Sequence, residues 1–271
     1  MFPRKQLRDR YFQQINQLQP LSPQDLAASA IVFAPHQDDE TLGCGGTIIL
    51  KQLAAADTKI VFMTDGSRSH NHLIPQAELV IRRQKEALDA AKCLGLKPDQ
   101  VIFLGFGDGE LQQAKEQAKE KVVQLLLAHQ PQQVFIPYVR ETHRDHLATN
   151  QIVLAALAHY PQTINIYEYP VWYWHHFPWT KPWGDRSLKL AYLKASIKAK
   201  LGRQLLQEFN YRVDINTVKT QKKQALAQHQ TQMERLIDDP SWGILKDVSE
   251  GEWLECFFQN IEIFRRTTNK Q

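Results

Sequence analysis

Two short polar motifs stand about a hundred residues apart, and each follows an apolar stretch. PHQDDE contains His36, Asp38 and Asp39, and THRDH contains His143 and His146. Consecutive carboxylates after a buried strand are costly to desolvate, so they need water, a partner or a cation. Two imidazoles and one carboxylate, with a fourth position left for water, match a catalytic zinc site. Fe²⁺, Co²⁺ or Mn²⁺ could take the place of zinc with such ligands.

Apolar strands and amphipathic helices alternate through the part of the chain that carries these motifs. Strands are predicted at 30–34, 59–64, 101–106 and 133–138, with helices at 41–56, around 79–95, at 114–129 and around 146–159. This alternation favours an α/β fold with a parallel sheet covered by helices on both faces. Ligands bind such sheets at the carboxyl ends of the strands. PHQDDE, DGSRSHNH, GDGE and HRDH each follow one of the four strands, so we expect them to converge.

After about residue 165 the alternation weakens, but no linker rich in Pro, Gly or Ser appears. We therefore expect a single domain over 1–271, with a core at about 28–165 and a C-terminal elaboration at about 166–271 that walls the site. The aromatic run WYWHHFPW, 172–179, fits core packing, a glycan platform or a subunit contact. Segment 186–235 has eleven Lys/Arg against three acids. It fits a solvated face or a surface that attracts an anionic substrate or lipid headgroup.

Composition restricts the class of protein. The chain has 271 residues, of which 43% are hydrophobic and 23% charged, as in ordinary globular proteins. No apolar run reaches the roughly 18 residues of a membrane span, and the N-terminal stretch lacks the apolar segment of a secretory signal. Three widely spaced cysteines without a CxxC pair favour a reducing, cytoplasmic location. No nucleic-acid motif accompanies the +4 charge, so no nucleic-acid partner is expected; a homo-oligomer stays open.

These motifs also carry a family resemblance. PHQDDETLGCGG resembles the (A/P)HPDDE motif of the LmbE-like, or PIG-L, de-N-acetylase family, and THRDH resembles its later HPDH motif. Further matches are TDGS, RRQKEAL followed by LG, LGFGDGEL and KKQALAQHQTQ, so the resemblance runs from about residue 30 to 232. It implies a Rossmann-like, three-layer αβα fold. It also implies hydrolysis of an N-acetyl group on an N-acetylglucosamine-type sugar or glycoconjugate through a zinc-activated water.

The resemblance implies roles for the motif residues. The zinc ligands would be His36, Asp39 and His146. Asp38 would be the general base, and His143 would stabilise the oxyanion or donate a proton. Gln37 and Arg144 replace the family's two prolines, which leaves both loops less pre-set.

The resemblance also implies residues that would bind substrate or orient the metal ligands. Arg83 matches a substrate-contacting arginine, Asp108 a sugar-hydroxyl acceptor, and the match around His229 suggests that it reaches the site. Asp145 would orient a histidine ligand from behind. Glu40 fits either an acid at a helix start or a partner behind the ligands.

Other interpretations stay open. The site could hydrolyse another amide or a phosphoester, although phosphate sites favour glycine-rich loops or paired metals. A carbohydrate-binding protein with a relict metal site would need neither Asp38 nor His143. His70 and His72 fit a surface loop or a contact with substrate or a metal near the mouth. The glycines of GCGG would allow close helix packing, with Cys44 as a small buried hydrophobe.

Overall fold

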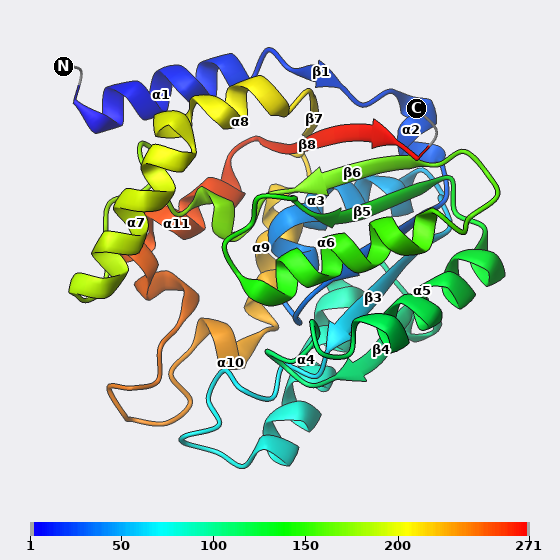
Figure 1. The fold of residues 1–271 in the computed structure, drawn as a ribbon, viewed down its shortest axis with the longest axis horizontal. Helices are drawn as coiled ribbons and strands as arrows, with labels where there is room; N and C mark the ends of the chain where they lie inside the picture. The colour runs from blue at the N-terminus through cyan, green and yellow to red at the C-terminus, as the bar shows by residue number, and fades with distance from the viewer. Residues whose placement is uncertain (1–2, 270–271) are drawn as a thin grey trace.

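A mixed sheet forms the centre of the computed structural model, which describes residues 3–269 (Figure 1). Its strands are β1 (Gln19–Pro20), β2 (Ala30–Ala34), β3 (Thr58–Thr64), β4 (Val101–Phe106), β5 (Gln133–Pro137), β6 (Asn165–Tyr169), β7 (Tyr211–Asp214) and β8 (Ile261–Thr268). They lie in the order β1-β7-β8-β6-β5-β2-β3-β4. β8 runs antiparallel to β6 and β7, and the other neighbouring strands of the described sheet are parallel. The predicted α/β fold with a mostly parallel sheet is confirmed.

Helices cover both faces of this sheet. They are α1 (Arg4–Ile15), α2 (Pro23–Ala27), α3 (Asp39–Leu53), α4 (Gln76–Cys93), α5 (Lys115–His129), α6 (Arg144–Leu157), α7 (Arg186–Lys198), α8 (Arg203–Glu208), α9 (Lys219–Ala227), α10 (Gln230–Met233) and α11 (Glu252–Glu255). Figure 1 shows α5 and α6 in front of the sheet and α3 and α9 behind it. No helix within residues 3–269 combines the length and apolarity that crossing a bilayer requires.

The central strands are apolar on both sides because each face packs against helices. Along β2, Ile31 and Phe33 join the core beneath α5 and α6, while Val32 and Ala34 join the core beneath α3 and α4. Side chains alternate between the two faces of a strand. A strand covered twice is therefore apolar throughout, which explains why short continuous apolar runs predicted these strands correctly.

Element boundaries differ from the prediction where the site begins. β2 and β4 match their predicted ranges, but the helix predicted from residue 41 begins at Asp39, and the one predicted from about residue 146 begins at Arg144. Both earlier starts place motif residues in a first helical turn. The elements α1, β1 and β8 were not predicted; β8 inserts between β6 and β7.

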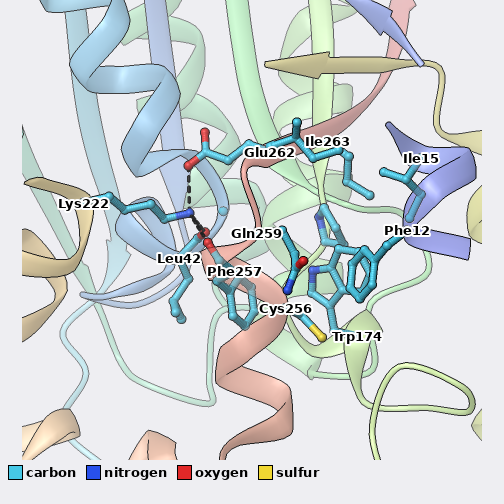
Figure 2. Close-up of a pocket in the computed structure, with 13 residues that line it drawn as sticks. Phe12, Ile15, Leu42, Trp174, Lys222, Cys256, Phe257, Gln259, Glu262 and Ile263 are labelled. Atoms are coloured by element: carbon cyan, nitrogen blue, oxygen red, sulfur yellow. Dashed lines mark hydrogen bonds and ion pairs between the residues drawn. The ribbon is translucent and has the colours of Figure 1, made fainter. Parts of the chain in front are cut away.

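Helix α3 is tied to the C-terminal part of the chain by a buried ion pair (Figure 2). Lys222 Nζ lies 2.8 Å from Glu262 Oε1 and donates to the carbonyls of Leu42 and Phe257. Glu262 also accepts hydrogen bonds from the backbone N–H groups of Gly46 and Thr47, at 2.7 and 2.8 Å. Both charges are therefore fully hydrogen-bonded beside a void of about 20 Å³.

The predicted close packing of the GCGG segment is confirmed. A Cβ on Gly43 would lie 2.2 Å from the Tyr169 ring, and one on Gly46 would lie 2.4 Å from Ile215. Cys44 between them is completely buried, as predicted for a small hydrophobe.

Candidate metal centre and active site

The turn between β2 and α3 presents two buried carboxylates to one cavity. Asp38 adopts φ 141°, a backbone conformation that costs about 1–3 kcal/mol for a residue other than glycine. Its backbone N–H donates to Glu40 Oε2 at 3.0 Å, which holds the turn. Helix α3 then begins at Asp39, and the side chains of Asp38 and Asp39 both line the cavity.

The three predicted metal ligands lie together. Asp39 Oδ2 lies 3.2 Å from His36 Nδ1 and 3.2 Å from His146 Nε2. Ligands bound at 2.0–2.1 Å in a tetrahedral zinc site are about 3.4 Å apart, a spacing that both contacts of Asp39 approach. Among the described residues, the groups whose ligand atoms all lie within 4.8 Å of one another join His36 either with His143 and His146 or with Asp108 and Asp145. Both ring nitrogens of His146 are buried without a hydrogen-bond partner, which is uncommon unless an ion or water completes the site. The residues therefore fit a divalent metal.

Carboxylates lie close to the outer nitrogens of both rings. His36 Nε2 lies 3.3 Å from both Asp108 Oδ1 and Asp145 Oδ2. His146 Nδ1 lies 3.4 Å from Glu141 Oε2. Each ring thus turns one nitrogen towards Asp39 and the other towards an acid, the arrangement found behind most metal-binding histidines.

Glu141 was missed by the sequence analysis. Its carboxylate accepts hydrogen bonds from the backbone N–H groups of Val171, Trp172 and Tyr173 at 2.7, 2.7 and 3.1 Å. It therefore joins His146 to the loop after β6. An acid two residues before the HRDH motif was the available signal.

The acids around the rings create a strongly negative site. Burial lowers the pKa of His146, but Asp39 and Glu141 outweigh it and raise that pKa to about 9. Burial likewise opposes a charged His36, yet its contacts with Asp108, Asp145 and Asp39 raise its pKa well above the ordinary value. Such a potential favours a bound cation.

Asp38 combines burial with one cationic neighbour. Burial and the adjacent Asp39 raise its pKa to about 7, although Arg83, His229 and His36 act in the opposite direction. Arg83 Nη2 lies 3.7 Å from Asp38 Oδ2 and donates to the Gln37 carbonyl at 2.5 Å. A carboxyl with a pKa near neutrality suits a general base.

His143 is neutral at pH 7, because burial and the neighbouring His36 and His146 lower its pKa to about 4. As N-cap of α6, its Nδ1 accepts a hydrogen bond from the Asp145 backbone N–H at 3.3 Å. Nε2 therefore carries the proton. A neutral His143 with its proton on Nε2 has a hydrogen-bond donor at that atom, and its role in the reaction stays a prediction.

The cavity at this centre has a volume of about 260 Å³, and its lining contains both polar and apolar residues. The polar residues include Arg68, Arg83 and Asp108, which follow β3 and β4 or lie on α4. The apolar residues include Trp172 and Trp253, which stack at 4.7 Å and come from the segment beyond residue 165. Helices α7, α10 and α11 lie on the side towards which the β6 arrow points (Figure 1). Four residues from the segment beyond 165 line the cavity: Trp172, Gln232, Leu245 and Trp253.

His229 does not line the cavity, contrary to the suggestion that it reaches substrate. It is completely buried, and its Nε2 lies 3.0 Å from Glu40 Oε1. Glu40 in turn accepts from the Asp38 backbone. Glu40 therefore holds the backbone of the Asp38 turn, and His229 contacts Glu40 on the side away from the cavity.

The weaker sequence signals lie elsewhere. His70 is buried, contacts the Gly243 carbonyl at 2.9 Å and stacks on Trp242, whereas His72 is exposed and contacts Ser241. The loops that lack the family's prolines have other restraints: the side-chain amide of Gln37 donates to the Thr64 carbonyl at 2.9 Å.

The aromatic run 172–179 divides between two environments. Trp172 lines the cavity, while Trp174 and Trp179 pack against each other and against Phe12. Core packing therefore accounts for most of the run.

Comparison with known proteins identifies related sequences for the first part of the chain. Residues 31–157 match the family model PIG-L, described as GlcNAc-PI de-N-acetylase. A curated diacetylchitobiose deacetylase from Thermococcus kodakarensis is 33% identical over 120 residues. That match covers 43% of this chain and 44% of the relative, so it spans less than half of either protein.

Solved structures extend the likeness to nearly the whole chain. N,N'-diacetylchitobiose deacetylase from Pyrococcus horikoshii has a TM-score of 0.66 at 20% identity, covering 99% of this chain and 94% of that one. GalB, the 4-carboxy-2-hydroxymuconate hydratase of Pseudomonas putida KT2440, has a TM-score of 0.59 at 15% identity, covering 89% and 95%. At these identities the likeness shows the fold alone, and a hydratase shares that fold. The reaction must therefore be argued from the site.

Proposed function

We propose that the protein is a metal-dependent N-deacetylase of amino-sugar derivatives. The match of residues 31–157 to the PIG-L model supports placing it in the PIG-L, or LmbE-like, family. The observation that carries the proposal is the position of Asp39 Oδ2, 3.2 Å from a nitrogen of each of two imidazoles. The names of the curated and structural relatives support an N-acetylated sugar as substrate.

His36, Asp39 and His146 would hold the ion, with zinc as the first candidate and Fe²⁺, Co²⁺ or Mn²⁺ as alternatives. A divalent ion in this position would lower the pKa of a water molecule and polarise the amide carbonyl. Asp145 and Glu141 would keep the two rings turned towards the ion.

Three further side chains would act on substrate. Asp38 would accept a proton from water and return it to the leaving amine, a contribution typically worth about 10²–10⁴-fold. His143 would donate its Nε2–H to the carbonyl oxygen as negative charge develops there. Arg83, buried and held by the carbonyls of Gln37 and Gly66, would present its guanidinium to sugar oxygens and keep Asp38 oriented. Asp108 would accept a hydrogen bond from a sugar hydroxyl, since it lines the cavity beside His36.

A catalytic site explains the geometry better than a relict one. A purely structural metal site would need neither the strained turn at Asp38 nor an open cavity beside His143. The free cysteines Cys44, Cys93 and Cys256 support a cytoplasmic location. The single-domain organisation over 1–271 and a homo-oligomer stay predictions.

Metal analysis combined with an amine-release assay tests the proposal. The purified protein is expected to contain a divalent metal and to release a primary amine from some members of a panel of N-acetylated sugars. A chelator should abolish the release, and added Zn²⁺ should restore it. A metal-loaded, folded protein that releases no amine from any N-acylated sugar would refute the function.

A further inference from the structure

A second cavity of about 330 Å³ opens beside the catalytic one. The two cavities share His143 and Trp172 as walls. The two cavities therefore adjoin at these side chains, and we call the second space the α7 groove. Figure 1 shows α7 beyond the end of β6 towards which the strand's arrow points.

The walls of the α7 groove are mainly apolar. Leu188, Ala191, Tyr192 and Ala195 of α7 line it at helical spacing, so one face of the helix forms one wall. The Tyr192 hydroxyl already donates to the Thr180 carbonyl at 2.6 Å. The two alanines leave the wall shallow, and Leu188 keeps 44% of its surface exposed although it faces the groove. Trp183 adds a further aromatic side chain, while Thr142 and His175 supply some polar atoms.

The lining of the groove favours a hydrocarbon chain over a second sugar ring as its occupant. A pyranose carries several hydroxyl groups, each of which needs a partner when water is removed. The polar groups of the groove lining belong to Thr142, two histidines and the aromatic side chains. Covering Leu188 and Trp183 removes apolar surface from water. An occupant with an apolar chain matches this chemistry.

The geometry of an amide decides which part of the substrate enters the groove. Arg68, Arg83, Asp108 and Arg144 line the catalytic cavity, and their polar groups suit sugar hydroxyls. A secondary amide is planar and trans, so its nitrogen substituent and its acyl carbon point in opposite directions. When the sugar is held by these polar residues, the acyl carbon points away from them, and the adjoining groove at Trp172 offers it an apolar site.

We infer that the α7 groove binds the acyl chain of the substrate, and that the substrate class is amino sugars N-acylated with an apolar chain longer than acetyl. The inference rests on the proposed hydrolase function and deepens it. In the reaction the amide C–N bond breaks and water oxygen bonds to the carbonyl carbon. The products are a fatty carboxylate and the sugar amine, which takes up the proton.

Three substrates distinguish an apolar chain on the acyl group from one on the sugar: N-acetylglucosamine, N-octanoylglucosamine and octyl N-acetylglucosaminide. The metal-loaded full-length protein is expected to hydrolyse N-octanoylglucosamine with a kcat/KM at least tenfold above that of N-acetylglucosamine. The octyl glycoside should resemble N-acetylglucosamine, because its chain lies on the sugar rather than on the acyl group.

A matched pair of variants on α7 tests the position of the chain. Leu188→Glu places a charge in the groove, while Leu190→Glu places the same charge two residues away, at a leucine that is 51% exposed and outside the groove lining. The ratio of kcat/KM for the octanoyl and acetyl substrates should fall at least tenfold in Leu188→Glu and stay within twofold in Leu190→Glu. Ala191→Trp, which fills the groove without adding charge, should lower the ratio in the same way.

The outcomes separate the two proposals. Acetyl hydrolysis without an octanoyl preference, or with equal ratios in the two glutamate variants, would overturn the groove assignment and leave the deacetylase intact. A preference for the octyl glycoside that Leu188→Glu abolishes would show an aglycone site and equally overturn it. Absence of amine release from all three substrates would overturn both proposals.

Discussion

Glu141 and His146 are both completely buried, and Glu141 Oε2 lies 3.4 Å from His146 Nδ1. The same carboxylate accepts three backbone hydrogen bonds from the loop after β6. One side chain thus connects a candidate metal ligand with the loop that carries Trp172, a wall shared by both cavities. Changes at Glu141 should therefore affect metal and substrate together.

Glu141→Gln should weaken metal binding. The amide has nearly the same shape but lacks the negative charge that faces His146, and loss of such a partner typically costs about 10–100-fold in metal affinity. Competition with a chromophoric chelator measures the effect. Glu116→Gln, at an exposed pair with Lys119 on α5, is the control and should leave affinity unchanged. Equal affinity in both variants would contradict the role.

Asp38→Asn should keep the metal and lose turnover. Asp38 lies next to Asp39 but does not share its contacts with the two imidazoles, so its replacement removes the base and spares the ligands. We expect kcat to fall by about 10²–10⁴-fold with a metal content equal to that of the parent protein. Asp9→Asn, at an exposed position on α1, should leave both unchanged. A metal-free Asp38→Asn protein would argue that Asp38 is a ligand.

Lys222→Met should destabilise the fold. It leaves Glu262 as a buried charge without its cation, and breaking a buried pair in this way costs about 3–5 kcal/mol. The free energy of unfolding, from denaturant titration, measures the loss. Lys222→Met combined with Glu262→Gln should be less destabilised than the single variant, because no unpaired charge remains. Lys85→Met, which removes the exposed pair with Asp89, should change stability by less than about 1 kcal/mol. Equal effects of the two single variants would refute the argument.

His176 should contribute to acid unfolding. Burial, with help from His175, lowers its pKa to about 4, compared with about 6.5 in an unfolded chain. Between these values the unfolded state binds more protons, so stability is full above about pH 6.5 and is lost as pH falls towards 4. This contribution arises because the folded environment of His176 disfavours its charged form.

His176→Asn keeps a donor near the Tyr173 carbonyl that His176 Nδ1 contacts, but it does not titrate. Its unfolding free energy, measured from pH 4 to 6.5, should depend less on pH, by up to about 1.4 kcal/mol per pH unit. His159→Asn, at an exposed position, should follow the parent protein. An unchanged slope in His176→Asn would contradict the prediction.

The residues that follow the parallel strands could be predicted from the sequence. Features that depend on side-chain packing could not. Motifs after parallel strands must meet at one edge of the sheet, which is why His36, Asp39 and His146 could be brought together in advance. The start of α3 at Asp39 could not be predicted, because it requires the unfavourable φ of Asp38 that Glu40 helps to hold. Propensities describe average backbones and give no signal for such a turn.

Long-range pairing explains the remaining misses. Strand β8 pairs with β6 and β7, which lie far from it in the sequence, and no local pattern encodes this pairing. Similarly, Glu40 contacts His229, which lies far from it in the sequence. This contact engages the His229 side chain, for which the family match suggested a contact with substrate. Both features become visible only after the sheet is assembled.

The order of translation has a consequence for the Lys222–Glu262 pair, because Glu262 is synthesised long after the residues of α3. His36, Asp39 and His146 leave the exit tunnel long before Glu262, whose carboxylate holds the backbone of α3 at Gly46 and Thr47. A nascent chain halted after His146 therefore has every proposed metal ligand but lacks the anchor of the helix that carries Asp39. Tight binding of the proposed metal should accordingly require translation of β8.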